Sequence, residues 1–113
     1  MKNDTVILFS RNGLGSSPEP LSKVLAEKFL TLTIESGILP AKILFYTEGV
    51  RLACNGSPVL SQLRKLEAQG VELVLCQTCL KYFELEKMVA VGVVGGMGDI
   101  LEALQKAEKV ISV

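Results

Sequence analysis

The segment Val71-Glu-Leu-Val-Leu75 runs directly into Cys76-Gln-Thr-Cys79. Val71 to Leu75 is a short apolar run behind Gly70, the pattern of a buried strand. A strand that ends in cysteine and turns into a helix places sulfur at the carboxyl edge of a sheet. Ligands of open α/β folds collect at that edge. The segment therefore predicts a fold class and a site together.

Strand and helix patterns alternate along the rest of the chain. Short apolar runs predict strands over 5–9, 41–46, 71–75, 89–94 and 109–113. Start and stop residues predict helices from Ser17-Pro18 to Gly37, from Ser57-Pro58 to Gly70 and from Asp99 onward, with shorter helical turns within 47–54 and 76–88. The alternation predicts one α/β domain over residues 1–113, a mainly parallel five-stranded sheet with helices on both faces.

Helical spacing predicts which side chains face the core. The expected inward residues are Leu21, Val24, Leu25, Phe29 and Leu32 in the first helix, Val59, Leu60, Leu63 and Leu66 in the second, and Ile100, Leu101 and Leu104 in the last. Apolar residues make up 49% of the chain, and the mean hydropathy is +0.40. This excess predicts both a covered sheet and an apolar surface that is hidden in an oligomer.

Charge and composition exclude several function classes. The chain has 12 basic and 12 acidic residues, no histidine and 5% aromatic residues. Scattered basic residues and few aromatics leave no footprint for nucleic-acid binding. Without histidine there is no histidine-based triad, Cys-His dyad or histidine metal site.

The cysteines predict a reducing compartment. The start, Met1-Lys-Asn-Asp4, is polar and is not expected to be a signal peptide, and no apolar stretch approaches the length of a membrane span. We therefore expect a cytoplasmic protein with no membrane association. In that setting a C-x-x-C pair indicates catalytic, redox or metal chemistry more than a structural disulfide.

Four segments share the predicted carboxyl edge, and they contain all three cysteines. They are residues 10–17, 47–56, 76–82 and 95–99. Cys79 is predicted in the first turn of a helix, where unpaired N–H groups and the helix dipole lower a thiol pKa, with Lys81 as added positive charge. The alternative is an inert buried thiol, which is favoured for Cys54 alone. A zinc site needs more ligands than the pair supplies, so no metal and no cofactor are predicted.

Two glycine-rich turns are candidates for binding an anion through backbone N–H groups. They are Asn12-Gly13-Leu-Gly15 and Gly95-Gly-Met-Gly98, and neither has the spacing of a dinucleotide or Walker loop. The alternative is that these glycines only permit tight turns. The candidate substrate-binding or anion-binding residues are Asn12, Gly13, Gly15, Cys54, Thr78, Gly96 and Gly98.

The sequence resembles the DsrE-like sulfurtransferase family, and more closely the DsrE-like C-terminal domain of YedF-type selenium-metabolism proteins. The resemblance runs nearly end to end, and its most specific motif is Cys76-x-Thr-Cys79-Leu80-x-Tyr82. The other matching pieces are Ser10 with Gly13-Leu-Gly15, Phe29 to Thr33, Leu39-Pro40, Gly49 to Leu52, Gly56-Ser57, Leu63 to Gly70, Gly92 and Met97. One departure is Ser16-Ser17-Pro18, where the family has acidic residues.

The resemblance implies a five-stranded α/β/α sandwich that assembles into homo-oligomers, dimers or trimers. It also implies sulfur transfer through a cysteine persulfide, between a donor and an acceptor protein. The active cysteine of sulfur-relay relatives maps best onto Cys76, and Cys79 is the second candidate or a resolving thiol. Two other hypotheses stay open at this point: a non-catalytic binding module and a dithiol oxidoreductase.

Overall fold

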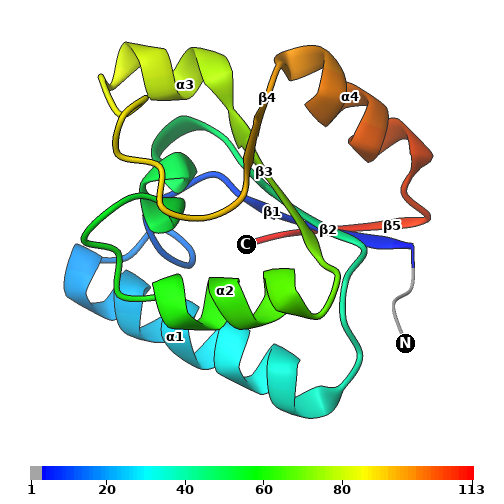
Figure 1. Ribbon diagram of the computed structural model, residues 1–113. Coiled ribbons are helices and arrows are strands. Elements are labelled where there is room, and N and C mark those ends of the chain that lie inside the picture. The colour runs from blue at the N-terminus through cyan, green and yellow to red at the C-terminus, as the bar shows by residue number, and fades with distance from the viewer. Residues whose placement is uncertain (1–3) are drawn as a thin grey trace.

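A computed structural model describes residues 4–113, so residues 1–3 of the polar start lie outside the described residues. Figure 1 shows strands and helical segments alternating along the chain. In order they are β1 (Thr5–Phe9), α1 (Glu19–Ser36), β2 (Lys42–Phe45), the 3₁₀ helix η1 (Thr47–Ala53), α2 (Leu60–Ala68), β3 (Glu72–Cys76), α3 (Gln77–Tyr82), β4 (Val93–Gly95), α4 (Met97–Lys106) and β5 (Lys109–Ser112).

The strands form one five-stranded sheet in the order β4-β3-β2-β1-β5, and every pairing in it is parallel. The chain moves outward from β1 to β4 and then returns to place β5 beside β1. Right-handed crossovers put α1 and α2 on one face and α4 on the other, as Figure 1 shows. The predicted α/β fold with a parallel sheet is confirmed.

Aromatic packing holds α1 against its face of the sheet. Phe9 of β1 stacks on Phe45 of β2 with ring centroids 5.7 Å apart. The ring of Phe29 in α1 meets Phe9 edge-on at 6.3 Å. The central strands are buried on both faces, which explains why they read as continuous apolar runs.

The strand predicted over 89–94 begins only at Val93. Residues 88–90 pair with the end of η1 instead: Asn55 N–H donates to Met88 O at 2.8 Å, and Ala90 N–H donates to Ala53 O at 2.9 Å. Val89 forms an isolated antiparallel bridge with Cys54. The apolar residues of 89–92 therefore belong to a loop and not to a strand. The backbone of this loop is hydrogen-bonded to residues 53–55, which are distant in sequence.

The predicted inward face of α1 is right only for Phe29, which packs against the core, and is otherwise wrong by about one residue. Leu21, Val24, Leu25 and Leu32 are exposed, whereas Ser22, Ala26 and Leu30 are buried. The small side chain of Ser22 lets the loop after β1 approach α1, and Leu14 N–H donates to Ser22 O at 3.0 Å. In α4, Ile100 is buried as predicted but Leu101 is exposed.

Two predicted helix starts also differ. The helix α2 begins at Leu60, and the Ser57 hydroxyl accepts a hydrogen bond from Val59 N–H at 3.2 Å in the turn before it. Helix α4 begins at Met97, so Asp99 lies inside its first turn. In the described part of the chain, no helix combines the length and the apolar character needed to cross a membrane.

Candidate functional site

The carboxyl ends of the strands bring three segments together: the loop after β1, η1 after β2, and α3 after β3. Cys76 is the last residue of β3, and Cys79 lies in the first turn of α3. The predicted strand-to-helix position of the pair is therefore what the structure shows (Figure 1).

The two thiols are neighbours but differ in accessibility. Cys76 is 0% exposed, whereas Cys79 is only partly buried. Cys76 acts on the pKa of Cys79 as a neighbouring hydrogen-bonding and charged group. Both are free thiols. A reagent that approaches from solvent meets the Cys79 sulfur first.

The backbone of η1 holds the Cys79 sulfur. Thr47 N–H donates to Cys79 Sγ at 3.1 Å. Thr47 adopts a φ of +50°, which is uncommon for a β-branched residue, and its hydroxyl donates to Ser10 O. Such a conformation costs about 1–3 kcal/mol and persists only where the surroundings enforce it. Here it aims an N–H group at sulfur.

The environment raises the pKa of the Cys79 thiol. Burial is the largest cause, and the hydrogen bond and charge of Cys76 add to it, while the Thr47 N–H acts in the opposite direction. The lowered pKa predicted from the helix N-terminus is therefore wrong. Desolvation and the neighbouring thiol outweigh the Thr47 N–H, which is the contribution that lowers the pKa.

Cys54 lies in the core. It is buried, and its thiol donates to Val50 O at 3.3 Å within the same 3₁₀ segment. Burial raises the pKa of this thiol, and the charge of Arg51 partly offsets the rise. The arrangement agrees with the inert buried thiol that the sequence favours for this residue.

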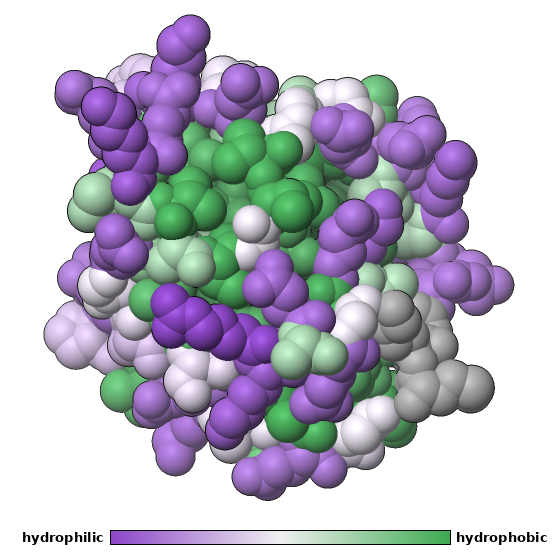
Figure 2. All heavy atoms as spheres, in the orientation of Figure 1, coloured by the Kyte–Doolittle hydropathy of each residue, from purple (hydrophilic) through white to green (hydrophobic). Residues whose placement is uncertain are grey.

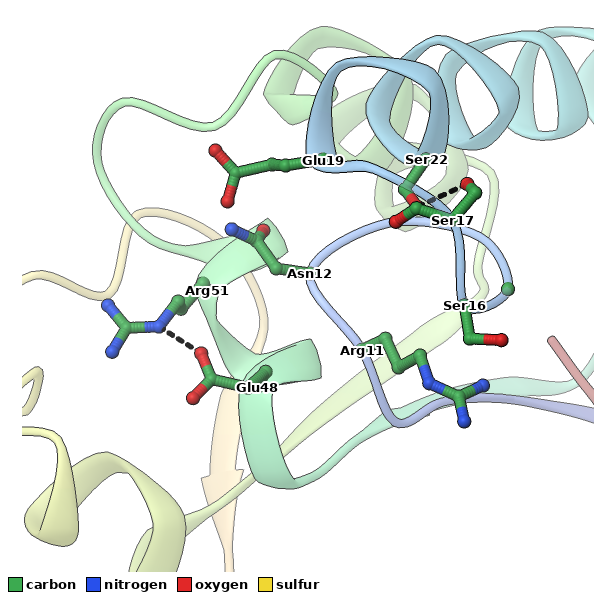
Figure 3. A pocket seen from close by; sticks show the side chains of 9 residues that line it. Arg11, Asn12, Ser16, Ser17, Glu19, Ser22, Glu48 and Arg51 are labelled. Carbon is green, nitrogen blue, oxygen red and sulfur yellow. Dashed lines mark hydrogen bonds and ion pairs between the residues drawn. The ribbon is translucent and has the colours of Figure 1, made fainter.

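A cleft of about 520 Å³ lies beside η1 on the side of the loop after β1. Figure 3 shows its walls, which come from that loop, the start of α1 and η1. Its volume is within the range of small-molecule sites. The lining residues are Arg11, Asn12, Gly15, Ser16, Ser17, Glu19, Ser22, Glu48 and Arg51.

The charges of the cleft are mostly paired. Arg51 Nε lies 2.5 Å from Glu48 Oε1, and Glu19 pairs with Lys23 at 3.1 Å. In the described part of the chain, no ion pair is formed by Arg11. Its exposed guanidinium is therefore the positive group of the cleft with spare capacity for an anion.

The helix η1 links the cleft to the thiols. Thr47 reaches Cys79, and Glu48 and Arg51 line the cleft. The guanidinium carbon of Arg51 also lies 4.7 Å above the ring of Phe83, directly after α3. Arg51 thus contacts both the cleft and the residue that follows the helix carrying Cys79.

A sequence profile places the chain among known proteins. The profile of the DsrE/DsrF-like family matches residues 7–113. The chain belongs to the DsrE/DsrF-like family. No curated protein sequence matches it. The closer likeness to YedF-type domains stays a prediction.

Solved structures share the DsrE/DsrF-like fold seen here. The ychN protein from E. coli matches with a TM-score of 0.71 at 22% identity, covering 100% of both chains. Protein MTH1491 of unknown function from Methanobacterium thermoautotrophicum matches with a TM-score of 0.68 at 17% identity, over 96% of this chain and 97% of that one. Protein BT1422 of unknown function from Bacteroides thetaiotaomicron gives 0.67 at 19%, over 97% and 95%.

On this DsrE/DsrF-like fold, only two of the predicted binding residues line the cleft, and the others lie elsewhere. Asn12 and Gly15 line the cleft. Gly13 is buried where a Cβ atom would lie 2.5 Å from Ser22 Cβ, so it permits close packing of the loop on α1. Thr78 is exposed on α3, away from the cleft lining.

The second glycine turn lies at the start of α4 and does not reach the cleft. The Asp99 carboxylate accepts a hydrogen bond from Gly96 N–H at 2.9 Å. The Asp99 carboxylate thus occupies the anion-binding position that the sequence predicted at Gly96 and Gly98. Repulsion between like charges disfavours a second anion there.

Reasoning from sequence missed the residues of η1 and Arg11. Thr47, Glu48 and Arg51 fell in a segment with an ambiguous pattern, and no local signal announces a backbone N–H that points at a sulfur 32 residues away. Within residues 4–113, no three Cys, Asp or Glu side chains gather in a way that could hold a metal ion.

Proposed function

We propose that this protein is a single-domain, cytoplasmic sulfur carrier, with sulfurtransferase-like activity, that holds sulfane sulfur as a persulfide on its Cys76–Cys79 pair. The observation that carries the proposal is the placement of two neighbouring free thiols at the carboxyl edge of the sheet, one of them partly exposed. Membership of the DsrE/DsrF-like family supports it.

Burial favours Cys79 as the sulfur acceptor, although the resemblance favours Cys76. A donor persulfide must reach the accepting sulfur in line with the bond that breaks, and Cys76 is 0% exposed. The Thr47 N–H then lies where it can donate to the thiolate or to the inner sulfur of the persulfide. Cys76 takes a supporting role beneath it.

The cleft is proposed to hold an anionic group of the sulfur donor. Arg11 supplies a guanidinium that forms no ion pair with the described residues. A carboxylate suits it, because guanidinium binds carboxylates in a planar fork. Figure 3 shows the Asn12 amide leaving the same loop in the opposite direction, toward Glu19 and Arg51. A donor or acceptor protein and a second copy of this chain are the proposed partners.

The proposal is tested by incubating the protein with glutathione persulfide and mapping added sulfur by mass spectrometry of peptides. We expect added sulfur on Cys79 in the wild type and in Cys54→Ser. We expect none in Cys79→Ser. If sulfur is added at neither cysteine of the pair, or equally to Cys54, the carrier function is refuted.

The neighbouring thiols also favour a second candidate, a dithiol oxidoreductase. A measured reduction potential separates the two candidates. A potential in the range of thioredoxin-like catalysts, roughly −270 to −120 mV, together with turnover of a disulfide substrate, supports redox catalysis. Loading of sulfur without such turnover supports the carrier.

A further inference from the structure

The two thiols of the pair lie at different depths. Cys79 Sγ accepts a hydrogen bond from a backbone N–H of η1 and is partly exposed, whereas the neighbouring Cys76 thiol is fully buried. A persulfide formed on Cys79 therefore has a second thiol beside its inner sulfur, on the side of the core. Strand β3 and helix α3 fix the position of this neighbour.

We infer that Cys76 is a resolving thiol that discharges the Cys79 persulfide as sulfide when no acceptor takes the sulfur. This inference rests on the proposed carrier function and adds a second fate for the persulfide sulfur, which is release as sulfide. The product is a Cys76–Cys79 disulfide. A protein or small-molecule dithiol then reduces the pair for another cycle.

The step balances without an added oxidant. The Cys76 sulfur, as thiolate, attacks Cys79 Sγ, and a Cys76–Cys79 S–S bond forms. The bond between Cys79 Sγ and the sulfane sulfur breaks, and its electron pair leaves with that sulfur as hydrosulfide. The two cysteines are oxidised, the sulfane sulfur is reduced, and the proton of Cys76 passes to solvent or to the departing sulfide.

Burial decides which sulfur Cys76 attacks. Attack on the outer sulfur would move that atom onto Cys76, at a side chain with 0% exposure. Close-packed interiors lack voids large enough for an added atom. Attack on the inner sulfur adds no atom to the core and leaves sulfide on the exposed side. Cys76 ends β3 and Cys79 lies three residues on, in the first turn of α3, so both thiols belong to one strand-to-helix turn where an S–S bond of about 2.05 Å can close.

The experiment loads the reduced wild type with inorganic polysulfide, removes the excess, and follows intact mass, released sulfide and disulfide-linked peptides over time. We expect a transient gain of one sulfur atom, followed by a Cys76–Cys79 disulfide and an equal amount of sulfide. Cys76→Ser and Cys76→Ala are expected to keep the added sulfur on Cys79, with release of sulfide reduced at least tenfold. Cys54→Ser is expected to behave as the wild type.

The possible results distinguish the resolving role of Cys76 from the carrier function on which it rests. A wild-type persulfide that is as long-lived as that of Cys76→Ser overturns the resolving role and leaves the carrier intact. Absence of sulfur on Cys79 in every variant overturns both. Peptide mapping of the wild type needs no substitution, so it decides the matter even if the Cys76 variants fold poorly.

Discussion

The reactivity of Cys79 is set by neighbours from separate parts of the chain. Burial and Cys76 raise its pKa, and the N–H of Thr47 works against that rise. At neutral pH the sulfur is therefore mostly protonated. Under the proposed sulfur-carrier function, the donor would supply part of the activation, by shifting the packing around Cys79 or by accepting its proton.

The rate of Cys79 alkylation by iodoacetamide is expected to rise with pH, with a midpoint above the ordinary thiol value of 9.0. Cys76→Ala should lower the midpoint, because the hydrogen bond and charge of the Cys76 thiol are removed while burial stays. Peptide mass spectrometry over a pH series measures both. A wild-type midpoint at or below 9.0 contradicts this account.

The same raised pKa values predict that alkaline pH destabilises the protein. The folded state binds the protons of Cys54 and Cys79 more tightly than the unfolded chain does. Their stabilising effect is complete below the unfolded pKa and is lost as the pH rises through the raised folded values. Urea unfolding of the wild type and of Cys54→Ala from pH 7 to 10 should show a smaller loss in the variant.

Arg11→Ala is expected to weaken loading by glutathione persulfide, because the guanidinium is the free positive group of the cleft. A lost charge-assisted hydrogen bond costs about 1.5 kcal/mol, so the half-loading concentration should rise about tenfold. Arg64→Ala on α2 is the matched control, since Arg64 does not line the cleft. Equal effects of the two substitutions would show that only net charge matters.

At the scale of elements, the position of η1 determines the geometry of the candidate site. It supplies the N–H that reaches Cys79 and the charged wall of the cleft. Its position depends on Gly49, where an added Cβ would lie 2.1 Å from Phe9 O. The sequence predicts only a helical turn over this segment, because nothing local reveals how closely it packs on β1.

Gly49→Ala is expected to destabilise the protein by about 1–3 kcal/mol, because η1 must move away from β1. The shift should also break the Thr47 contact and speed alkylation of Cys79. Urea unfolding and alkylation rates measure the two effects. Gly98→Ala in α4 is the control: a Cβ there meets no atom within 4 Å, so the substitution should be neutral or stabilise by up to about 1 kcal/mol.

Elements with strong local signals were predicted well. The bounds of β1 match the prediction, and α3 begins within the C-x-x-C motif, so that Cys79 lies in its first turn as expected. The extent of β4 and the inward face of α1 were wrong. Both depend on partners elsewhere in the chain: residues 88–90 bond to the end of η1, and the loop after β1 presses on Ser22.

At the scale of the whole molecule, the sheet leaves an apolar edge. Strand β4 ends the sheet and exposes Val93 and Val94, and Met97 and Leu101 are exposed on α4 next to it. Figure 2 shows apolar side chains gathered on the face around β4. An unpaired, apolar edge strand of this kind is a surface for association. We propose that a second copy of the chain covers it.

Val93→Lys is expected to shift the protein from a homo-oligomer toward monomer, because it places a charge on the edge strand. Val110→Lys is the matched control: it changes the same residue type on β5, the opposite edge, at similar exposure, 43% against 53%. Size-exclusion chromatography with light scattering measures the mass. A monomeric wild type contradicts the prediction, and dissociation by Val110→Lys alone places the contact at the β5 edge.

The sequence by itself determined the α/β class, the parallel sheet and the position of the cysteines after β3. Apolar runs, turn residues and motif spacing are local signals, so they can be recognised without knowing any tertiary contact. The tertiary structure alone decided that Cys79 is accessible, that Cys76 lies buried against it, and that Thr47 donates to its sulfur. Burial and hydrogen bonds between distant segments arise from how η1 packs between β1 and α3, which no local pattern encodes.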